Sequence, residues 1–172
     1  MRTTKVGIES IPVIQSLAHT TWAVTYKDIL SEAQMSYMLD LIYSAASLQN
    51  QIEAHGHQFI LATDSEKAVG FASWSVKENP EPSIYMLHKI YVDPGQQGKG
   101  IGKILLDFVI ADIVPLGAKN LELNVNRHNK ALGFYQNAGF IIIGEKDNPI
   151  GNGYFMNDFI MNLTLGQLTE AF

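Results

Sequence analysis

The stretch Asp93-Pro94-Gly95-Gln96-Gln97-Gly98-Lys99-Gly100-Ile101-Gly102-Lys103 separates two apolar runs of different period. The run before it, residues 84–92, is short, rich in β-branched and aromatic side chains, and broken by Asp-Pro-Gly, so it predicts a strand. The run after it predicts an amphipathic helix that Pro115 ends. Its apolar side chains recur three or four residues apart, at Ile101, Ile104, Leu105 and Phe108. The sequence therefore predicts a strand, a glycine-rich turn and the start of a helix.

Such a turn can hold an anion, because the first amide groups of a helix have no partner inside it and the helix dipole favours negative charge there. Glycines at 98, 100 and 102 remove side chains that would keep a bulky anion away from the backbone. A Walker loop is excluded, because Ile104 follows Lys103 where Ser or Thr is required. A dinucleotide fingerprint, G-x-G-x-x-G, opens the first unit of a parallel sheet. It is also excluded, because the glycines here follow the pattern G-x-G-x-G and lie more than halfway along the chain. A tight turn into a helix, without a ligand, stays the plain alternative.

Length and composition predict one globular domain spanning residues 1–172. No apolar run approaches the ~18 residues of a membrane helix and no signal-peptide core is visible, so we expect a cytoplasmic protein without a membrane partner. The absence of cysteine excludes disulfides, thiolate metal sites and a cysteine nucleophile. A net charge of −5 argues against nucleic acid as a partner and is compatible with cationic substrates.

The rest of the chain alternates between strand and helix signals. A capping box at Ser31 and Gln34 predicts the start of a helix, and Asn129 and Gly139 are expected to cap and stop a later one. Further helix is expected from residue 11 to about 17 or beyond, and residues 49–53 are classed as a polar stretch. The other expected strands are residues 5–9, 59–62, 68–74, 121–125, 140–144 and 153–165, with turns at 64–67 and 79–82.

This order of elements predicts an α/β fold with a mixed, mainly antiparallel sheet flanked by helices. Residues 84–92 and 121–125 flank the helix after the glycine turn and are expected to pair in parallel. Aromatic residues near Trp22 and Tyr26 are candidates for the border of a substrate groove. His55 and His57 could bind a metal, but no third ligand is near in sequence, and we expect a loop that leads into a strand and no metal.

Read as Gln97-x-x-Gly100-x-Gly102, the turn resembles the acetyl-CoA pyrophosphate loop of the GNAT acetyltransferase superfamily. Downstream, Asn129-Lys130-Ala131-Leu132-Gly133-Phe134-Tyr135-Gln136-Asn137-Ala138-Gly139-Phe140 is similar to the second signature of that superfamily. The resemblance covers residues 57–165. Residues 21–52 look like the polyamine and diamine acetyltransferase branch, which is a softer match.

The resemblance implies a splayed parallel strand pair at the site of the co-substrate, acetyl-CoA. In the family, a backbone amide of the strand before the turn stabilises the oxyanion of the reaction. Asn129 would bond the pantetheine arm, or only cap its helix. The residues implied in binding acetyl-CoA are Ile90, Val92, Gln97, Gly98, Lys99, Gly100, Ile101, Gly102, Lys103, Asn129 and Tyr135.

Tyr135 matches the general acid of the family, which protonates the departing thiolate, and its alternative is a core ring. The common glutamate base has no counterpart, because Met86 stands at the matching position. His88 is the best titratable replacement, with a structural histidine as its alternative. Glu122 and a chain of water molecules are the other options for the base.

We therefore expect direct transfer of an acetyl group to an amine, in a ternary complex, since a cysteine intermediate is excluded. A small amine or polyamine is the leading acceptor. A protein lysine or N-terminus is the rival acceptor, and a non-catalytic acetyl-CoA-binding module is the rival from another class. The sequence leaves the oligomeric state open, with a homodimer as one option.

Overall fold

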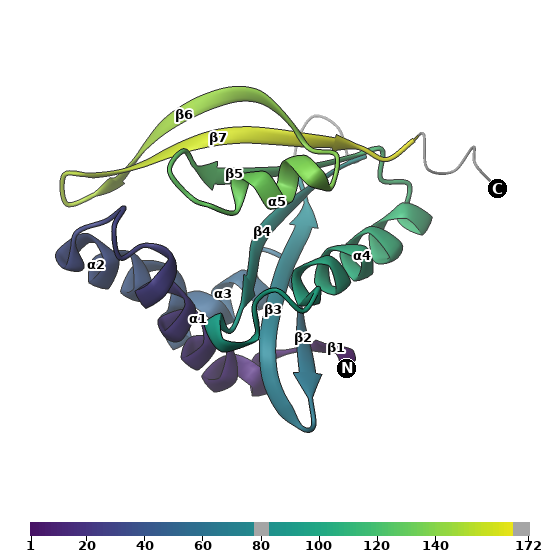
Figure 1. Cartoon of the computed structure of the whole chain (residues 1–172), viewed down its shortest axis with the longest axis horizontal. Helices are drawn as coiled ribbons and strands as arrows, with labels where there is room; N and C mark the ends of the chain where they lie inside the picture. Colours follow the sequence, from purple (N-terminus) through teal and green to yellow (C-terminus); the bar gives the residue numbers. More distant parts are fainter. Residues whose placement is uncertain (78–82, 167–172) are drawn as a thin grey trace. The chain divides into compact units, whose positions relative to one another are not determined.

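The computed structural model describes residues 1–77 and 83–166, and it combines a seven-stranded sheet with five α-helices (Figure 1). The strands are β1 (Arg2–Val6), β2 (Gln58–Asp64), β3 (Lys67–Val76), β4 (Ile84–Val92), β5 (Asn120–Asn126), β6 (Ile141–Gly151) and β7 (Tyr154–Thr164). The α-helices are α1 (Ile11–Thr25), α2 (Glu32–Tyr43), α3 (Ala45–Glu53), α4 (Ile101–Ile113) and α5 (Leu132–Asn137). Short 3-10 helices are η1 (Ile8–Ser10), η2 (Pro94–Gln96) and η3 (Val114–Leu116).

The sheet has the strand order β1-β2-β3-β4-β5-β7-β6. Antiparallel ladders join β1 to β2, β2 to β3, β5 to β7 and β6 to β7, whereas β4 and β5 pair in parallel. The predicted α/β fold with a mixed, mainly antiparallel sheet is thus confirmed, including its parallel pair. None of the helices in the described part of the chain is long and apolar enough to cross a membrane.

The chain divides into two compact units. The first unit consists of Met1–Ser75 and His88–Asp112, and the second of the described residues of Val76–Leu87 and Ile113–Phe172. Strand β4 passes from one unit to the other between Leu87 and His88.

In the first unit, helices pack against both faces of β3. On one face Phe71 contacts Tyr43 of α2, with ring centroids 6.2 Å apart. On the other face Gly70 leaves room for α4, because a Cβ there would lie 3.2 Å from a methyl carbon of Leu105 and 2.9 Å from the carbonyl oxygen of Tyr91. Glycine at position 70 therefore lets the helix that follows the glycine turn lie close to the sheet.

The predicted capping box of α2 is present on its Ser31 side, where the hydroxyl accepts a hydrogen bond of 3.1 Å from the amide of Gln34. The prediction for the aromatic residues at the end of α1 is wrong. Trp22 and Tyr26 are only 3% and 8% exposed, and Trp22 packs edge-on against Tyr43 with centroids 5.7 Å apart. These rings fill the core of the first unit, because the apolar stripe of α1 continues to its last turn.

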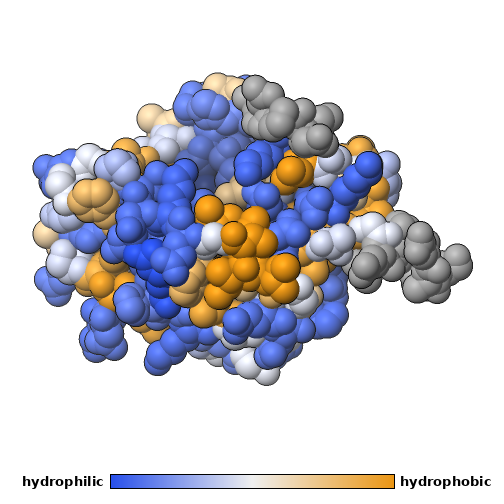
Figure 2. All heavy atoms as spheres, turned by 90° about the horizontal axis from the view of Figure 1, so that it is seen from above, coloured by the Kyte–Doolittle hydropathy of each residue, from blue (hydrophilic) through white to orange (hydrophobic). Residues whose placement is uncertain are grey.

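In the second unit, β6 and β7 form a long hairpin (Figure 1). One face of the β5–β7 ladder is apolar and lies against the α5 end, where Gly139 would place a Cβ 3.2 Å from Leu163. On the outer strand β6, Ile141, Ile142 and Ile143 are exposed, and Figure 2 shows hydrophobic residues gathered on the viewed surface.

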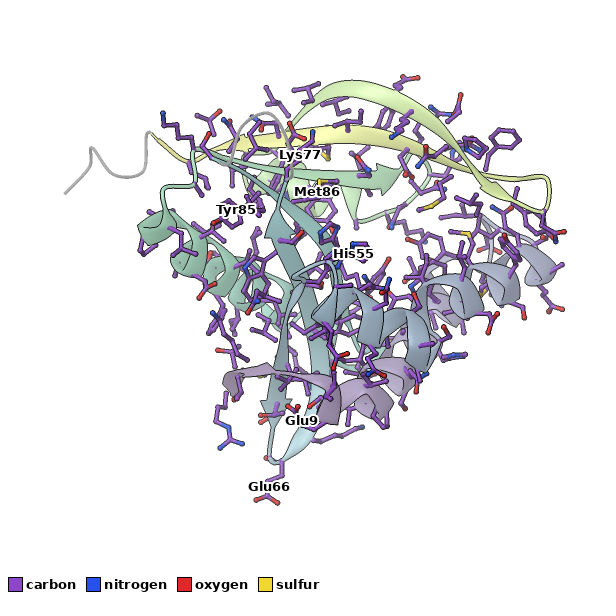
Figure 3. The ribbon with its side chains drawn as sticks, turned by 180° about the vertical axis from the view of Figure 1, so that it is seen from behind. Glu9, His55, Glu66, Lys77, Tyr85 and Met86 are labelled. Carbon is purple, nitrogen blue, oxygen red and sulfur yellow. The ribbon has the colours of Figure 1, made fainter. Side chains whose placement is uncertain are left out.

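Several boundaries differ from the sequence predictions. Residues 49–53 are the second half of α3, a helix that was not predicted, and β6 continues past Gly144 to Gly151. Helix α4 ends at Ile113, and Pro115 lies inside η3. Figure 3 shows Glu66 at the tip of the β2–β3 turn, where Ser65 and Glu66 have positive φ. The turn predicted at residues 79–82 lies outside the described residues.

Candidate active site

The glycine turn between β4 and α4 has the backbone that the sequence predicted. Gly98 and Gly100 have φ of +82° and +78°, values that residues with a Cβ rarely adopt. Both glycines are exposed, no described atom lies within 4 Å of a Cβ built on either, and α4 begins directly after Gly100 at Ile101. A bulky group can therefore approach the backbone of the turn at these two glycines, directly before the start of α4.

The side chains of the turn are mostly paired with one another or with neighbours. Lys99 donates to the side-chain oxygen of Gln96 at 2.9 Å, and Lys103 forms an ion pair of 2.6 Å with Asp107. Ile101 is buried, and the side chain of Gln97 is exposed. The side chain of Asp93 accepts from the amide of Gly95 at 2.9 Å, which fixes the entry into the turn. The backbone amides are thus the donors of the turn that are available to an anion, and Lys99 and Lys103 add positive charge beside them.

The parallel ladder of β4 and β5 ends early. It pairs Ile84–Leu87 with residues 120–123, although both strands continue beyond these residues. The amide of Asp93 donates to Val69 of β3 at 2.8 Å, and amide directions alternate along a strand. The amides of Val92 and Ile90 therefore point to the other edge of β4, beyond the end of the β5 ladder. The parallel ladder thus ends before the two residues whose amides are expected to contact acetyl-CoA.

His88 stands on β4 beside two polar neighbours of the same unit. Its Nε2 lies 2.7 Å from the hydroxyl oxygen of Ser75, and its ring stacks on that of His57 with centroids 3.9 Å apart and an angle of 5°. Burial, then the charges of His57 and Lys89, lower the pKa of His88 to about 3. The residue keeps an exposed surface. His88 is therefore neutral at physiological pH and accessible to a proton donor.

Lys89, the next residue on β4, is a buried cation that the sequence analysis did not single out. Its ammonium donates to Gln51 Oε1 at 2.6 Å and lies 5.5 Å from the ring centroid of Phe59. Burial lowers the pKa of Lys89 to about 8. The sequence did contain a signal for this burial. Side chains alternate between the two faces of a strand, so Lys89 shares a face of β4 with the apolar residues Leu87 and Tyr91. Its charge helps to keep His88 neutral.

The alternative base, Glu122, lies in the second unit on β5, opposite Met86 of β4. Its carboxylate accepts from Lys77 at 2.6 Å, and Figure 3 labels Lys77, which directly follows β3, and Met86 of β4. Glu122 is 9% exposed. Because the carboxylate is engaged in an ion pair, we rank it behind His88.

Tyr135 and Asn129 also belong to the second unit. Tyr135 is 7% exposed, with its ring edge-on to Phe134 and Phe140 at centroid distances of 5.3 and 5.7 Å. Asn129 accepts from the amide of Ala131 at 2.9 Å, whereas α5 begins at Leu132. Asn129 therefore shapes the turn before α5, and Ala131 occupies the cap position that the sequence assigned to Asn129.

The structure thus places the predicted residues in two sets. His88, Ile90, Val92 and residues 97–103 lie in the first unit, and Asn129 and Tyr135 lie in the second. Across the described residues, no group of three or more His, Cys, Asp or Glu side chains could hold a metal ion.

Comparison with known proteins gives a consistent family. The model of the acetyltransferase (GNAT) domain matches residues 26–154. N-alpha-acetyltransferase RimI of Mycobacterium tuberculosis is 30% identical over 113 residues, which cover 66% of this chain and 70% of that protein. Peptidyl-lysine N-acetyltransferase YjaB of Salmonella typhimurium is 29% identical over 98 residues, covering 56% of this chain and 59% of YjaB.

Solved structures share the fold. The PaiA N-acetyltransferase of Thermoplasma acidophilum, determined in complex with coenzyme A, superposes with a TM-score of 0.78 at 24% identity over 95% of this chain and 99% of that one. Because the family model matches well over half of the chain, this protein belongs to the GNAT superfamily of acetyl-CoA-dependent N-acetyltransferases.

Proposed function

We propose that this chain moves an acetyl group from acetyl-CoA directly to the amine of a small acceptor, with a diamine or polyamine as the leading class. The observation that supports the proposal is the exposed turn at Gly98 and Gly100, which has positive φ and leads directly into the start of α4, where first-turn amides have no partner inside the helix.

Residues 97–103 would hold the pyrophosphate through backbone amides, with Lys99 and Lys103 adding positive charge. The amides of Ile90 and Val92 would bind the thioester carbonyl, whose oxygen becomes negative when the amine attacks. Asn129 would contact the pantetheine arm.

The reaction needs a base and an acid. The amine nitrogen attacks the carbonyl carbon, the new C–N bond forms and the C–S bond breaks. His88 is neutral at the pH of the reaction and would accept the proton from the amine, as a weak base because its pKa is lowered to about 3. Tyr135 would give its proton to the departing sulfur. No covalent intermediate with the protein is required.

One feature favours a small cationic acceptor, because the net charge of −5 attracts cations. The names of RimI and YjaB favour the rival acceptors, a protein N-terminus and a protein lysine. A non-catalytic acetyl-CoA-binding module is the third option.

An acceptor panel tests the proposal. The protein is incubated with acetyl-CoA and, in turn, spermidine, 1,3-diaminopropane, propylamine, a lysine peptide and a peptide with a free N-terminal alanine, and thiol release is followed. The chain has no cysteine, so every thiol comes from coenzyme A. Turnover with the diamine and polyamine supports the proposal. Turnover with the peptides alone supports the rival acceptors, and acetyl-CoA binding without any turnover supports the binding module.

Three further expectations stay predictions. They are a single acetyltransferase domain over residues 1–172, a cytoplasmic location and a homodimer.

A further inference from the structure

Asp158 of β7 is a buried carboxylate without a hydrogen-bond partner. The residue is 6% exposed, and within residues 1–77 and 83–166 no hydrogen bond reaches its side chain. The carboxylate oxygens keep a narrow contact with solvent. This follows because the fully enclosed polar atoms without a hydrogen-bond partner belong to other residues. Buried carboxylates are normally paired or hydrogen-bonded, because burying an unpaired charge is costly. Asp158 therefore has an open place for a donor.

The sheet face that carries Asp158 is polar. Asp158 is paired with Asn126 of β5, and side chains two residues apart on a strand share a face. The residues of β5 and β7 that share this face are Asn120, Glu122, Asn124, Asn126, Asp158, Ile160, Asn162 and Thr164. The opposite face carries Leu121, Leu123, Val125, Met161 and Leu163, and all five are buried. The second unit thus has an apolar face and a face of carboxylates and amides.

The nearby cations do not pair with Asp158. Arg127 is bound to Glu145 and Asp147. Lys146 is the cross-strand neighbour of Asp158 on β6, but it is exposed, and the described residues show no ion pair between the two. Burial raises the pKa of Asp158 to about 6, the charges of Arg127 and Lys146 lower it, and Asp147 raises it. At pH 8 the carboxylate is ionised. It then presents a negative charge without a direct partner.

Next to it, Asn124 offers an amide oxygen. Asn124 is the diagonal cross-strand neighbour of Asp158 on the same face, its side chain is exposed, and in the described part of the chain it has no hydrogen bond of its own. A carboxylate and an amide oxygen are both acceptors, and an ammonium group has three donors and no acceptor. The pair suits a primary ammonium group.

We propose that Asp158 and Asn124 bind an ammonium group of the acceptor that does not react. A carboxylate favours the charged form of a bound amine, whereas the nucleophilic amine must lose its proton. The group at Asp158 is thus a second amine, and the acceptor class is that of diamines and polyamines. This inference rests on the proposed function and deepens it by naming the residue that selects the acceptor.

The test compares Asp158→Asn with the parent protein on spermidine, 1,3-diaminopropane and propylamine. The asparagine keeps the size of the side chain and removes its charge. For the two acceptors with a second amine, KM should rise at least about tenfold with kcat little changed, because the lost contact serves binding. For propylamine, kcat/KM should be unchanged. Asp64→Asn is the matched control, because Asp64 is exposed at the β2–β3 turn and the change in net charge is the same. Its kinetics should equal those of the parent.

Equal loss on propylamine and spermidine would overturn the inference, as would an unchanged KM for spermidine, and both leave the proposed function in place. If no amine is acetylated, the proposed function fails, and calorimetry of spermidine with the protein alone still tests the site. Binding that the parent shows and Asp158→Asn loses supports the site, and equal binding by both refutes it.

Discussion

The hydroxyl group of Tyr135 distinguishes its two possible roles, because only a residue with this group can donate a proton, whereas the ring alone is enough for packing. Tyr135→Phe keeps the ring contacts with Phe134 and Phe140 and removes the hydroxyl. We expect turnover to fall about ten- to a thousandfold, the low end for general acid catalysis because a thiolate leaves well unaided. Acetyl-CoA affinity should change little. The measurement is single-turnover kinetics, so that chemistry limits the rate, and a parental rate there makes Tyr135 a core residue only.

At position 88 the lowered pKa fixes the form of the pH profile. A histidine with a pKa of about 3 is neutral at every pH from 6 to 9, so a base at this position is fully available throughout. His88→Ala should lower kcat by roughly a hundredfold, the low end for general base catalysis because a pKa of about 3 makes His88 a weak base, and the factor should be the same across that range. The rate of the parent should still climb with pH as the amine acceptor deprotonates.

His88→Gln and His55→Ala serve as controls for this measurement. Glutamine retains a partner for Ser75 but no base, so it should be as slow as alanine. His55, labelled in Figure 3, is exposed and bonds Asn50, and its replacement should leave the rate unchanged. A loss that varies with pH, or full activity of His88→Gln, would return His88 to a structural role.

At position 158 the same carboxylate that we assign to binding should weaken the fold. The pKa of Asp158 is higher in the folded protein than in the unfolded chain, so the protonated carboxyl group favours folding. This contribution to the free energy of unfolding is complete below pH 3.8 and is lost as the pH rises through about 6. At pH 8, Asp158→Asn should therefore raise the free energy of unfolding by as much as about 3 kcal/mol, and at pH 4 by little. Urea unfolding at both pH values measures this. A variant less stable than the parent at pH 8 would contradict the sign.

At the scale of elements, the glycine turn can be tested by its backbone. Gly100→Ala meets no neighbour within 4 Å but must adopt a φ of +78°, which costs roughly 1–2 kcal/mol. Acetyl-CoA at about a hundred times its Kd should raise the free energy of unfolding of the parent by roughly 2.7 kcal/mol, and this gain should shrink in Gly100→Ala because its Cβ enters the anion space.

Gly117→Ala is the matched control for the glycine turn. Gly117 has a φ of +91° and equally open surroundings, and it lies at the end of η3 outside the turn. It should lose similar stability and keep the full gain from acetyl-CoA. If acetyl-CoA stabilises the two variants equally, as measured by thermal unfolding, the glycine turn does not take part in acetyl-CoA binding.

Local sequence predicted the elements around this turn well, because their signals are local. Strand β4 has the predicted bounds, and the start of α4 follows from its apolar spacing. Helix α3 was missed, because Leu48 is its only buried residue and so few apolar positions leave no periodic pattern. The second half of β6 is polar, and pairing along β7 makes it a strand, an effect of tertiary context that propensity does not contain.

The candidate site divides in the same way. The glycine turn was predictable because positive φ strongly favours glycine, and Tyr135 was assigned from a motif. The stacking of His88 on His57 was not predictable, because it joins residues far apart in sequence. Nor was the unpaired state of Asp158, which depends on what its cross-strand neighbours bind.

For the whole molecule, the two tryptophans have an optical consequence. Trp22 and Trp74 are the only tryptophans of the chain; both are buried, at 3% and 1% exposed, and both lie in the first unit. Their fluorescence emission should shift to the red when the first unit unfolds and should not respond to unfolding of the second unit. Far-UV circular dichroism, in contrast, follows the strands of both units. Coincident urea transitions would make residues 1–172 one cooperative domain, as predicted, and separate transitions would contradict it. Any titration with acetyl-CoA followed by tryptophan emission thus observes the unit that contains the glycine turn.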